Sequence, residues 1–172
     1  MDKTRSLLGH LQSEYRESLV QSELPPELVK SSPKISRGEN YKGLPWLVLD
    51  YPRRFGVENI FAIRTMFWWG NFFSVTLHLS GEFKEQVEDK LIASFKKLRK
   101  EGFSICMNEN QWEHHFEKGN YTSLDKIKSK EFEDIIRNKP FIKIAYRLSI
   151  GKWDKAKKLL MKHFDLLLRS VS

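Results

Sequence analysis

Residues 60–80, IFAIRTMFWWGNFFSVTLHLS, decide the fold, because they contain two apolar runs joined at Trp69-Gly70-Asn71. Folding the segment about Gly70 gives one apolar face and one mixed face, since successive side chains of a strand alternate. This parity needs a connection with an odd number of residues, so we predict a β-hairpin with a three-residue loop. The apolar face holds Phe61, Ile63, Thr65, Phe67, Phe73, Val75, Leu77 and Leu79, and the mixed face pairs Ala62 with His78, Arg64 with Thr76 and Met66 with Ser74.

The sequence around the hairpin predicts helices at both ends and three more strands. Apolar residues recur at three- and four-residue steps in 8–19, 83–98, 124–136 and 153–167, which is typical of amphipathic helices. Apolar or alternating runs predict strands at 46–51, 103–107 and 142–148. Residues 31–43 are polar and contain glycines, and are predicted to form an exposed loop. We therefore expect a single α+β domain over residues 1–172, with a mainly antiparallel sheet of about five strands, helices chiefly on one face, and helices at the N- and C-termini.

Composition predicts a cytoplasmic protein without a membrane span. Hydrophobic residues make up 40% and charged residues 30% of the 172 residues, as in soluble globular proteins. The first fifteen residues lack the apolar core of a secretory signal, and the lone Cys106 excludes an internal disulfide. The longest uncharged run near the hairpin is too short and too polar for a transmembrane helix, so no membrane partner is expected.

Basic residues concentrate in the C-terminal helix. Residues 140–172 contain 8 basic and 2 acidic residues, a net of +6 out of +8 for the whole chain. Helical spacing places Lys155, Lys158 and Lys162 opposite the apolar stripe, facing solvent. Nucleic-acid binding through this helix is one hypothesis, but the aromatic residues lie elsewhere, in the hairpin, so it is not favoured. Apolar residues also lie beside the basic stripe, where they are available to contact a second subunit. A homo-oligomer is therefore an open alternative.

The mixed face of the hairpin is the candidate site. Arg64, with Arg147 of the predicted strand 142–148, has the donors to bind a carboxylate or phosphate. His78 adds a pH-sensitive hydrogen bond, Thr76 lies on the same face, and Trp68 or Trp46 forms an apolar wall. We favour a binding or interaction protein of otherwise unknown function that accepts a small anionic ligand on this face. The simpler alternative is an ordinary solvated sheet face.

An enzyme is the alternative from another class. His78, or the loop residues His114 and His115, has the chemistry for acid–base or metal-assisted catalysis. Adjacent histidines lack the four-residue spacing of helical metal sites, and Cys106 is expected to be a buried strand residue. Phosphate-binding loops, dinucleotide-binding glycine signatures and serine-hydrolase elbows are absent from the sequence. No catalytic residue, metal or cofactor is therefore assigned.

The predicted order of elements resembles the YktB-like family of small uncharacterised bacterial proteins. The resemblance covers an N-terminal helix, an aromatic hairpin, a helix, a strand, a variable segment, a strand and a terminal helix. Its motif in this chain is Tyr41-Lys42-Gly43-Leu44-Pro45. The resemblance implies an α+β fold and an unknown function, and it transfers no functional residue.

Overall fold

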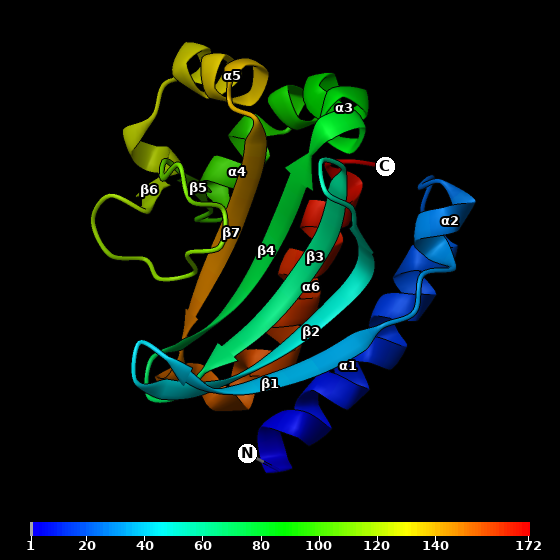
Figure 1. Ribbon diagram of the computed structural model, residues 1–172, viewed down its shortest axis with the longest axis vertical. Helices are drawn as coiled ribbons and strands as arrows, with labels where there is room; N and C mark the ends of the chain where they lie inside the picture. The colour runs from blue at the N-terminus through cyan, green and yellow to red at the C-terminus, as the bar shows by residue number, and fades with distance from the viewer. Residues whose placement is uncertain (1) are drawn as a thin grey trace.

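A seven-stranded antiparallel sheet forms the centre of the computed structural model, which describes residues 2–172 (Figure 1). The strand order is β1-β2-β3-β4-β7-β5-β6. The strands are β1 (Lys34–Tyr41), β2 (Leu44–Phe55), β3 (Ile60–Trp68), β4 (Phe72–Ser80), β5 (Ser104–Cys106), β6 (Tyr121–Ser123) and β7 (Phe141–Ser149). The α-helices are α1 (Asp2–Val20), α2 (Pro26–Val29), α3 (Gly81–Ala93), α4 (Phe95–Lys100), α5 (Ser129–Asn138) and α6 (Ala156–Arg169), and short 3-10 turns, η1 (Leu124–Lys126) and η2 (Ile150–Lys155), precede α5 and α6.

The central hairpin has the predicted register. Trp68 pairs with Phe72 across the three-residue loop, and Arg64 pairs with Thr76. Gly70 has a φ of +69°, a left-handed conformation that glycine adopts without steric cost. The prediction of loop length and of the two faces is therefore confirmed.

The prediction of about five strands is wrong, because β1 and β6 were missed. Strand β1 lies within residues 31–43, which were predicted to be a loop. It is an edge strand with much of its surface exposed, so its sequence lacks the apolar alternation that marks internal strands. Strand β6 has three residues, too few for a pattern. The predicted helix over 83–98 is also divided, into α3 and α4 at Ser94.

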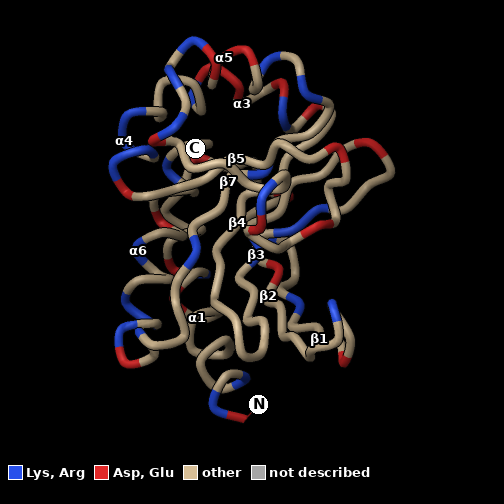
Figure 2. The backbone as a smooth tube through the Cα atoms, turned by 90° about the vertical axis from the view of Figure 1, so that its left-hand side faces the viewer, with Lys and Arg blue, Asp and Glu red and all other residues tan. Residues whose placement is uncertain are grey.

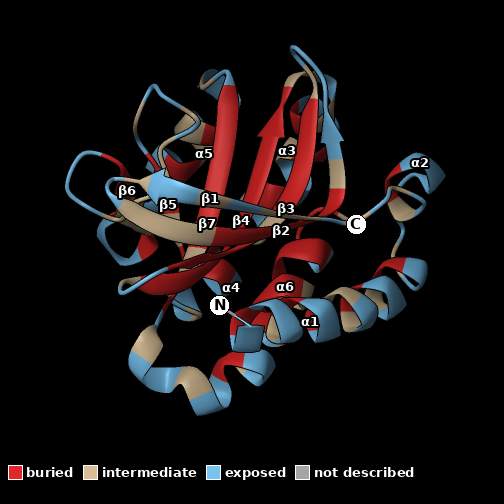
Figure 3. Cartoon of the chain, turned by 60° about the horizontal axis from the view of Figure 1, so that its bottom comes forward, coloured by how far each residue is buried: buried red, intermediate tan, exposed pale blue. Residues whose placement is uncertain are grey.

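The helices pack on one face of the sheet, where the main hydrophobic core lies (Figures 1 and 3). All six α-helices of the described chain contribute buried side chains to this core. Tyr15 of α1 stacks on Phe164 of α6 with ring centroids 3.6 Å apart. The Tyr15 hydroxyl also hydrogen-bonds Thr65 Oγ1 of β3 at 2.9 Å, which ties the helix layer to the sheet. No helix in residues 2–172 has the length and apolarity to cross a membrane.

The C-terminal helix α6 buries its apolar stripe and exposes its basic one, as predicted. Leu160 and Phe164 are fully buried in the core, whereas Lys158 and Arg169 are exposed. Lys162 is exposed but pairs with Glu101. Basic residues recur along α6 on the outside of the molecule (Figure 2).

Candidate functional site

A cavity of about 480 Å³ opens on the sheet face opposite the helices. Strands β1, β2 and β3 form its floor, and residues 107–120, which we call the covering loop, contribute one wall. This volume falls within the range of natural small-molecule sites. The cavity is therefore the candidate functional site.

The cavity floor is built from three rows of side chains that cross the strands. Because alternate residues of a strand share a face, each row lies two residues further along. The charged row is Lys34–Asp50–Arg64, the middle row is Ser36–Val48–Met66, and the aromatic row is Gly38–Trp46–Trp68. All of these residues except Gly38 and Trp68 line the cavity.

A β-bulge adds two residues to the charged end of the cavity. Between Asp50 and Arg53, strand β2 has one residue more than its partner β3. The extra residue reverses the alternation, so Arg53 and Phe55 face the same side as Asp50 and line the cavity. Sequence alternation alone would have placed these two side chains on the opposite face.

Gly38 lets the Trp46 indole lie flat on strand β1. A Cβ atom added at Gly38 would stand 2.4 Å from the indole ring, much closer than atoms in van der Waals contact. The absence of a side chain at Gly38 therefore leaves the space that the Trp46 indole occupies in the cavity wall.

Replacing Gly38 with alanine is therefore expected to displace the Trp46 indole. The readout is the ¹⁵N–¹H resonance of the Trp46 indole, which should shift by far more than the other four indole resonances. Gly9→Ala is the matched control, because nothing lies within 4 Å of a Cβ at Gly9 of α1. An unchanged Trp46 resonance in Gly38→Ala would contradict this account of the wall.

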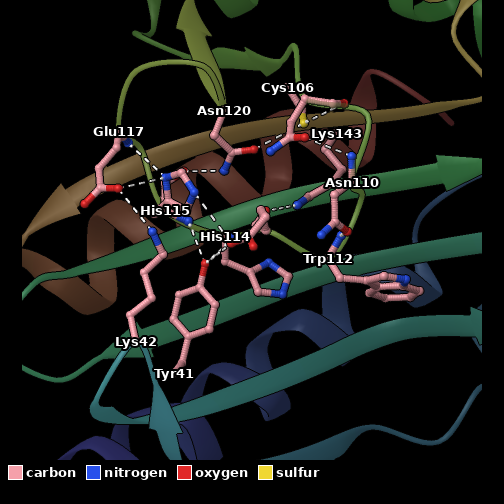
Figure 4. A network of polar contacts seen from close by, with 12 residues as sticks. Tyr41, Lys42, Cys106, Asn110, Trp112, His114, His115, Glu117, Asn120 and Lys143 are labelled. Atoms are coloured by element: carbon pink, nitrogen blue, oxygen red, sulfur yellow. Dashed lines mark hydrogen bonds and ion pairs between the residues drawn. The ribbon is translucent and has the colours of Figure 1, made fainter.

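The covering loop is held down by the Tyr41 hydroxyl (Figure 4). This oxygen accepts hydrogen bonds from the backbone N–H groups of His114 at 2.9 Å and His115 at 3.2 Å. It also donates to Glu113 Oε2 at 2.9 Å. With three partners on the loop, Tyr41 presents only its ring to the cavity.

Two buried side chains of the sheet add further tethers. Lys143 Nζ donates to the backbone carbonyl of Glu113, and His78 Nε2 hydrogen-bonds Gln111 Oε1 at 2.8 Å. Because the amide oxygen accepts, the proton of neutral His78 sits on Nε2. Burial lowers the pKa of His78 to about 4 and that of Lys143 to about 8, since each charged form loses hydration.

At the charged end of the cavity, Arg64 and Asp50 form a bidentate salt bridge. Arg64 Nε lies 2.7 Å from Asp50 Oδ1, and Arg64 Nη2 lies 3.0 Å from Asp50 Oδ2. The remaining nitrogen, Nη1, donates to His114 Nε2 at 3.3 Å, so the proton of neutral His114 sits on Nδ1. Burial, followed by the nearby cations Lys143 and Arg64, lowers the pKa of His114 to about 2. His114 therefore stays neutral at physiological pH.

The structure places the five residues predicted for the site on one sheet face, but only Arg64 lines the cavity. Thr76 and His78 are buried beside it, and Trp68 is buried with its indole N–H donated to the Tyr41 carbonyl. Arg147 instead lies over the rings of Phe72 and Phe116. Arg147 does not line the cavity, so the two arginines do not converge on a ligand bound there.

The other loop residues form a local network. His115 lies between Glu113 and Glu117, at 3.5 and 3.6 Å, and the backbone carbonyl of His115 accepts from Asn120. Within residues 2–172, no three His, Cys, Asp or Glu side chains gather in a geometry suited to a metal ion. Cys106 is buried.

Sequence reasoning missed most of the cavity residues. Lys34 and Ser36 lay in the segment predicted as a loop, and Val48 and Asp50 lay in the predicted strand 46–51 without a proposed role. Trp46 was predicted only as an alternative to Trp68 for the apolar wall. The signal for Arg53 was its place after Tyr51-Pro52 in an adjacent arginine pair. No protein-family model, curated protein or solved structure matches the chain. The resemblance to YktB-like proteins therefore stays a prediction.

Proposed function

We propose that the protein binds a small organic anion in the cavity on its β1–β3 face. The observation that carries the proposal is the charge balance of the cavity lining. Three cations, Lys34, Arg53 and Arg64, line it together with one carboxylate, Asp50. Asp50 is already paired with Arg64, which leaves two cations for a ligand.

Lys34 and Arg53 have hydrogen-bond donors that no residue in 2–172 uses. Neither forms an ion pair with any residue in 2–172, and Arg53 uses only its Nε, which donates to the Ser32 carbonyl at 2.9 Å. Charge-assisted hydrogen bonds from such groups to a carboxylate or phosphate are about twice as strong as neutral ones. The Arg64–Asp50 pair holds its own geometry and lines the charged end as a fixed polar surface.

Aromatic rings surround this charged end. Phe55 and Trp112 are exposed at the cavity, with ring centroids 6.4 Å apart, and Arg64 Cζ lies 5.8 Å from the Phe55 ring. Small-molecule sites are lined mainly by apolar and aromatic side chains, with a few polar groups that fix the orientation of the ligand. Rings beside two free cations therefore favour an organic anion over an inorganic ion. The proposed role is thus binding, with the covering loop as a fixed wall.

The experiment compares 3-phenylpropionate with its neutral amide, 3-phenylpropionamide, by NMR titration of the ¹⁵N-labelled protein. The two probes have the same shape and differ in charge. We expect the acid to bind at least about tenfold more tightly, which corresponds to one charge-assisted hydrogen bond. Equal affinity of acid and amide, or no binding of either, would reject the proposal.

Neutralising both free cations, in Lys34→Gln with Arg53→Gln, is expected to weaken binding of 3-phenylpropionate by about tenfold to a hundredfold. The physical reason is loss of both donors to the carboxylate. The control variant, Lys158→Gln with Arg169→Gln, removes the same charge from exposed positions on α6. If both double variants weaken binding equally, only long-range charge matters and the cavity is not the site.

A further inference from the structure

The cavity is chemically asymmetric along the strands. Its charged side chains lie in the charged row and just beyond the bulge, whereas the middle and aromatic rows carry none. From Asp50 to Trp46 is four residues along β2, or about 13 Å at the usual rise per residue. The cavity is therefore long enough to separate the two ends of a small ligand.

The uncharged end presents an apolar surface. Val48 and Met66 are buried and form its floor. Trp46 stands beside them, and Tyr41, whose hydroxyl is taken up by the covering loop, offers its ring. The Tyr41 ring is in turn held edge-on by Trp68, with centroids 5.1 Å apart. Ser36 carries the one hydroxyl of the middle row, and the other two residues of that row, Val48 and Met66, are apolar.

From this asymmetry we infer that the ligand is an amphiphilic acid with an aromatic body, bound in one direction. Its carboxylate or phosphate lies at Lys34 and Arg53, and its ring lies over Val48 and Met66 against Trp46 and Tyr41. This inference rests on the proposed function, and it adds the class of ligand and its orientation. Aromatic walls favour a flat ring over a flexible acyl chain, because rings pack in offset or edge-to-face geometries.

The test separates the acid group from the ring. NMR titrations measure the affinities of 3-phenylpropionate, propionate and pentanoate for the wild-type protein. We expect 3-phenylpropionate to bind at least about tenfold more tightly than either aliphatic acid, as burial of a ring predicts. Saturation with 3-phenylpropionate should also shift the Trp46 indole resonance, which propionate should leave in place.

Ser36→Trp blocks the middle row from the exposed edge strand β1, where a larger side chain does not enter the helix-side core. This variant should lose the tenfold advantage of 3-phenylpropionate and keep the affinity for propionate. Ser13→Trp is the matched control on the exposed surface of α1 and should change neither affinity.

The outcomes distinguish the two proposals. If 3-phenylpropionate and propionate bind equally, or if Ser36→Trp weakens both acids alike, the ring does not lie on the middle row and the inference is overturned. The proposed function would survive that result, because the acids still bind more tightly than 3-phenylpropionamide. If the acid and the amide show no difference, the proposed function itself fails. The Trp46 resonance provides a readout that does not depend on the folding of any variant.

Discussion

Lowering the pH from 7 to 4 is expected to reduce the free energy of unfolding by about 3 kcal/mol through His78 alone, with a further loss through His114. The neutral His78 imidazole is buried beneath the covering loop, and the neutral His114 imidazole belongs to that loop and is largely enclosed against Arg64. The pKa of each is lowered, to about 4 for His78 and about 2 for His114. The unfolded chain instead takes up these protons near pH 6.5. Between pH 6.5 and 4 the unfolded state therefore binds more protons, and stability falls as the pH falls.

The variants His78→Gln and His114→Gln test this expectation. Glutamine keeps a hydrogen-bonding group near the position of Nε2, which donates to Gln111 in His78 and accepts from Arg64 in His114. Denaturant unfolding at a series of pH values should give a shallower loss of stability between pH 6.5 and 4 in each variant. Burial also lowers the pKa of His163, but this residue is present in all three proteins and cancels in the comparison.

Hydrogen exchange of the backbone amides shows which part of the protein loses stability at low pH. Because His78 contacts the covering loop and His114 is part of it, backbone amides of residues 107–120 should lose protection first as the pH falls. Identical pH profiles for the wild-type protein and both variants would show that these histidines do not carry the acid sensitivity.

Replacing Asp50 with alanine is expected to lower the free energy of unfolding by about 3 kcal/mol, the scale for removing one partner of a buried ion pair. The side chains of Asp50 and Arg64 are 8% and 18% exposed, so the remaining guanidinium would be largely desolvated without a counter-charge. His114 would lose its position too, since Arg64 donates to its Nε2. Urea denaturation at pH 7 measures the change.

Two further variants interpret the result. The double variant Asp50→Ala with Arg64→Met removes both charges and should recover much of the lost stability, because no unpaired charge remains. Asp134→Ala breaks the exposed pair between Asp134 and Lys130 and should change stability by less than about 0.5 kcal/mol. A loss in Asp50→Ala no larger than in Asp134→Ala would mean that the bridge contributes little and that solvent reaches Arg64 freely.

The sequence predicted the centre of the fold better than its edges. The pattern of apolar residues predicted the hairpin of β3 and β4, the strand that contains Arg147, and the amphipathic helix α6. Burial of one face makes apolar residues recur at the period of the strand or helix. The edge strand β1 could not be predicted in this way, because a strand exposed at the edge does not need alternating apolar residues. Since β1 supplies Lys34 and Ser36, missing it removed one side of the candidate site.

The cavity opens on the sheet face that the sequence singled out, and of the five residues predicted for the site it is lined only by Arg64. Arg64 was found because its parity in β3 is fixed by the hairpin register. Arg53 and Phe55 reach the same face only because a bulge adds one residue, and alternation cannot reveal a bulge. His78 and Thr76 have the predicted parity but are both buried, His78 against Gln111 and Trp112 of the covering loop.

The sequence by itself determined which residues of 60–80 face the helices and which face away, because hairpin parity and hydrophobic burial are local constraints. The tertiary structure decided what happens on the second face. Contacts between residues far apart in the chain, such as Tyr41 with His114 and Lys143 with Glu113, bring the covering loop over one half and leave the other half open as a cavity. Such pairings depend on how strands and loops meet in space, and no local pattern of residues encodes them.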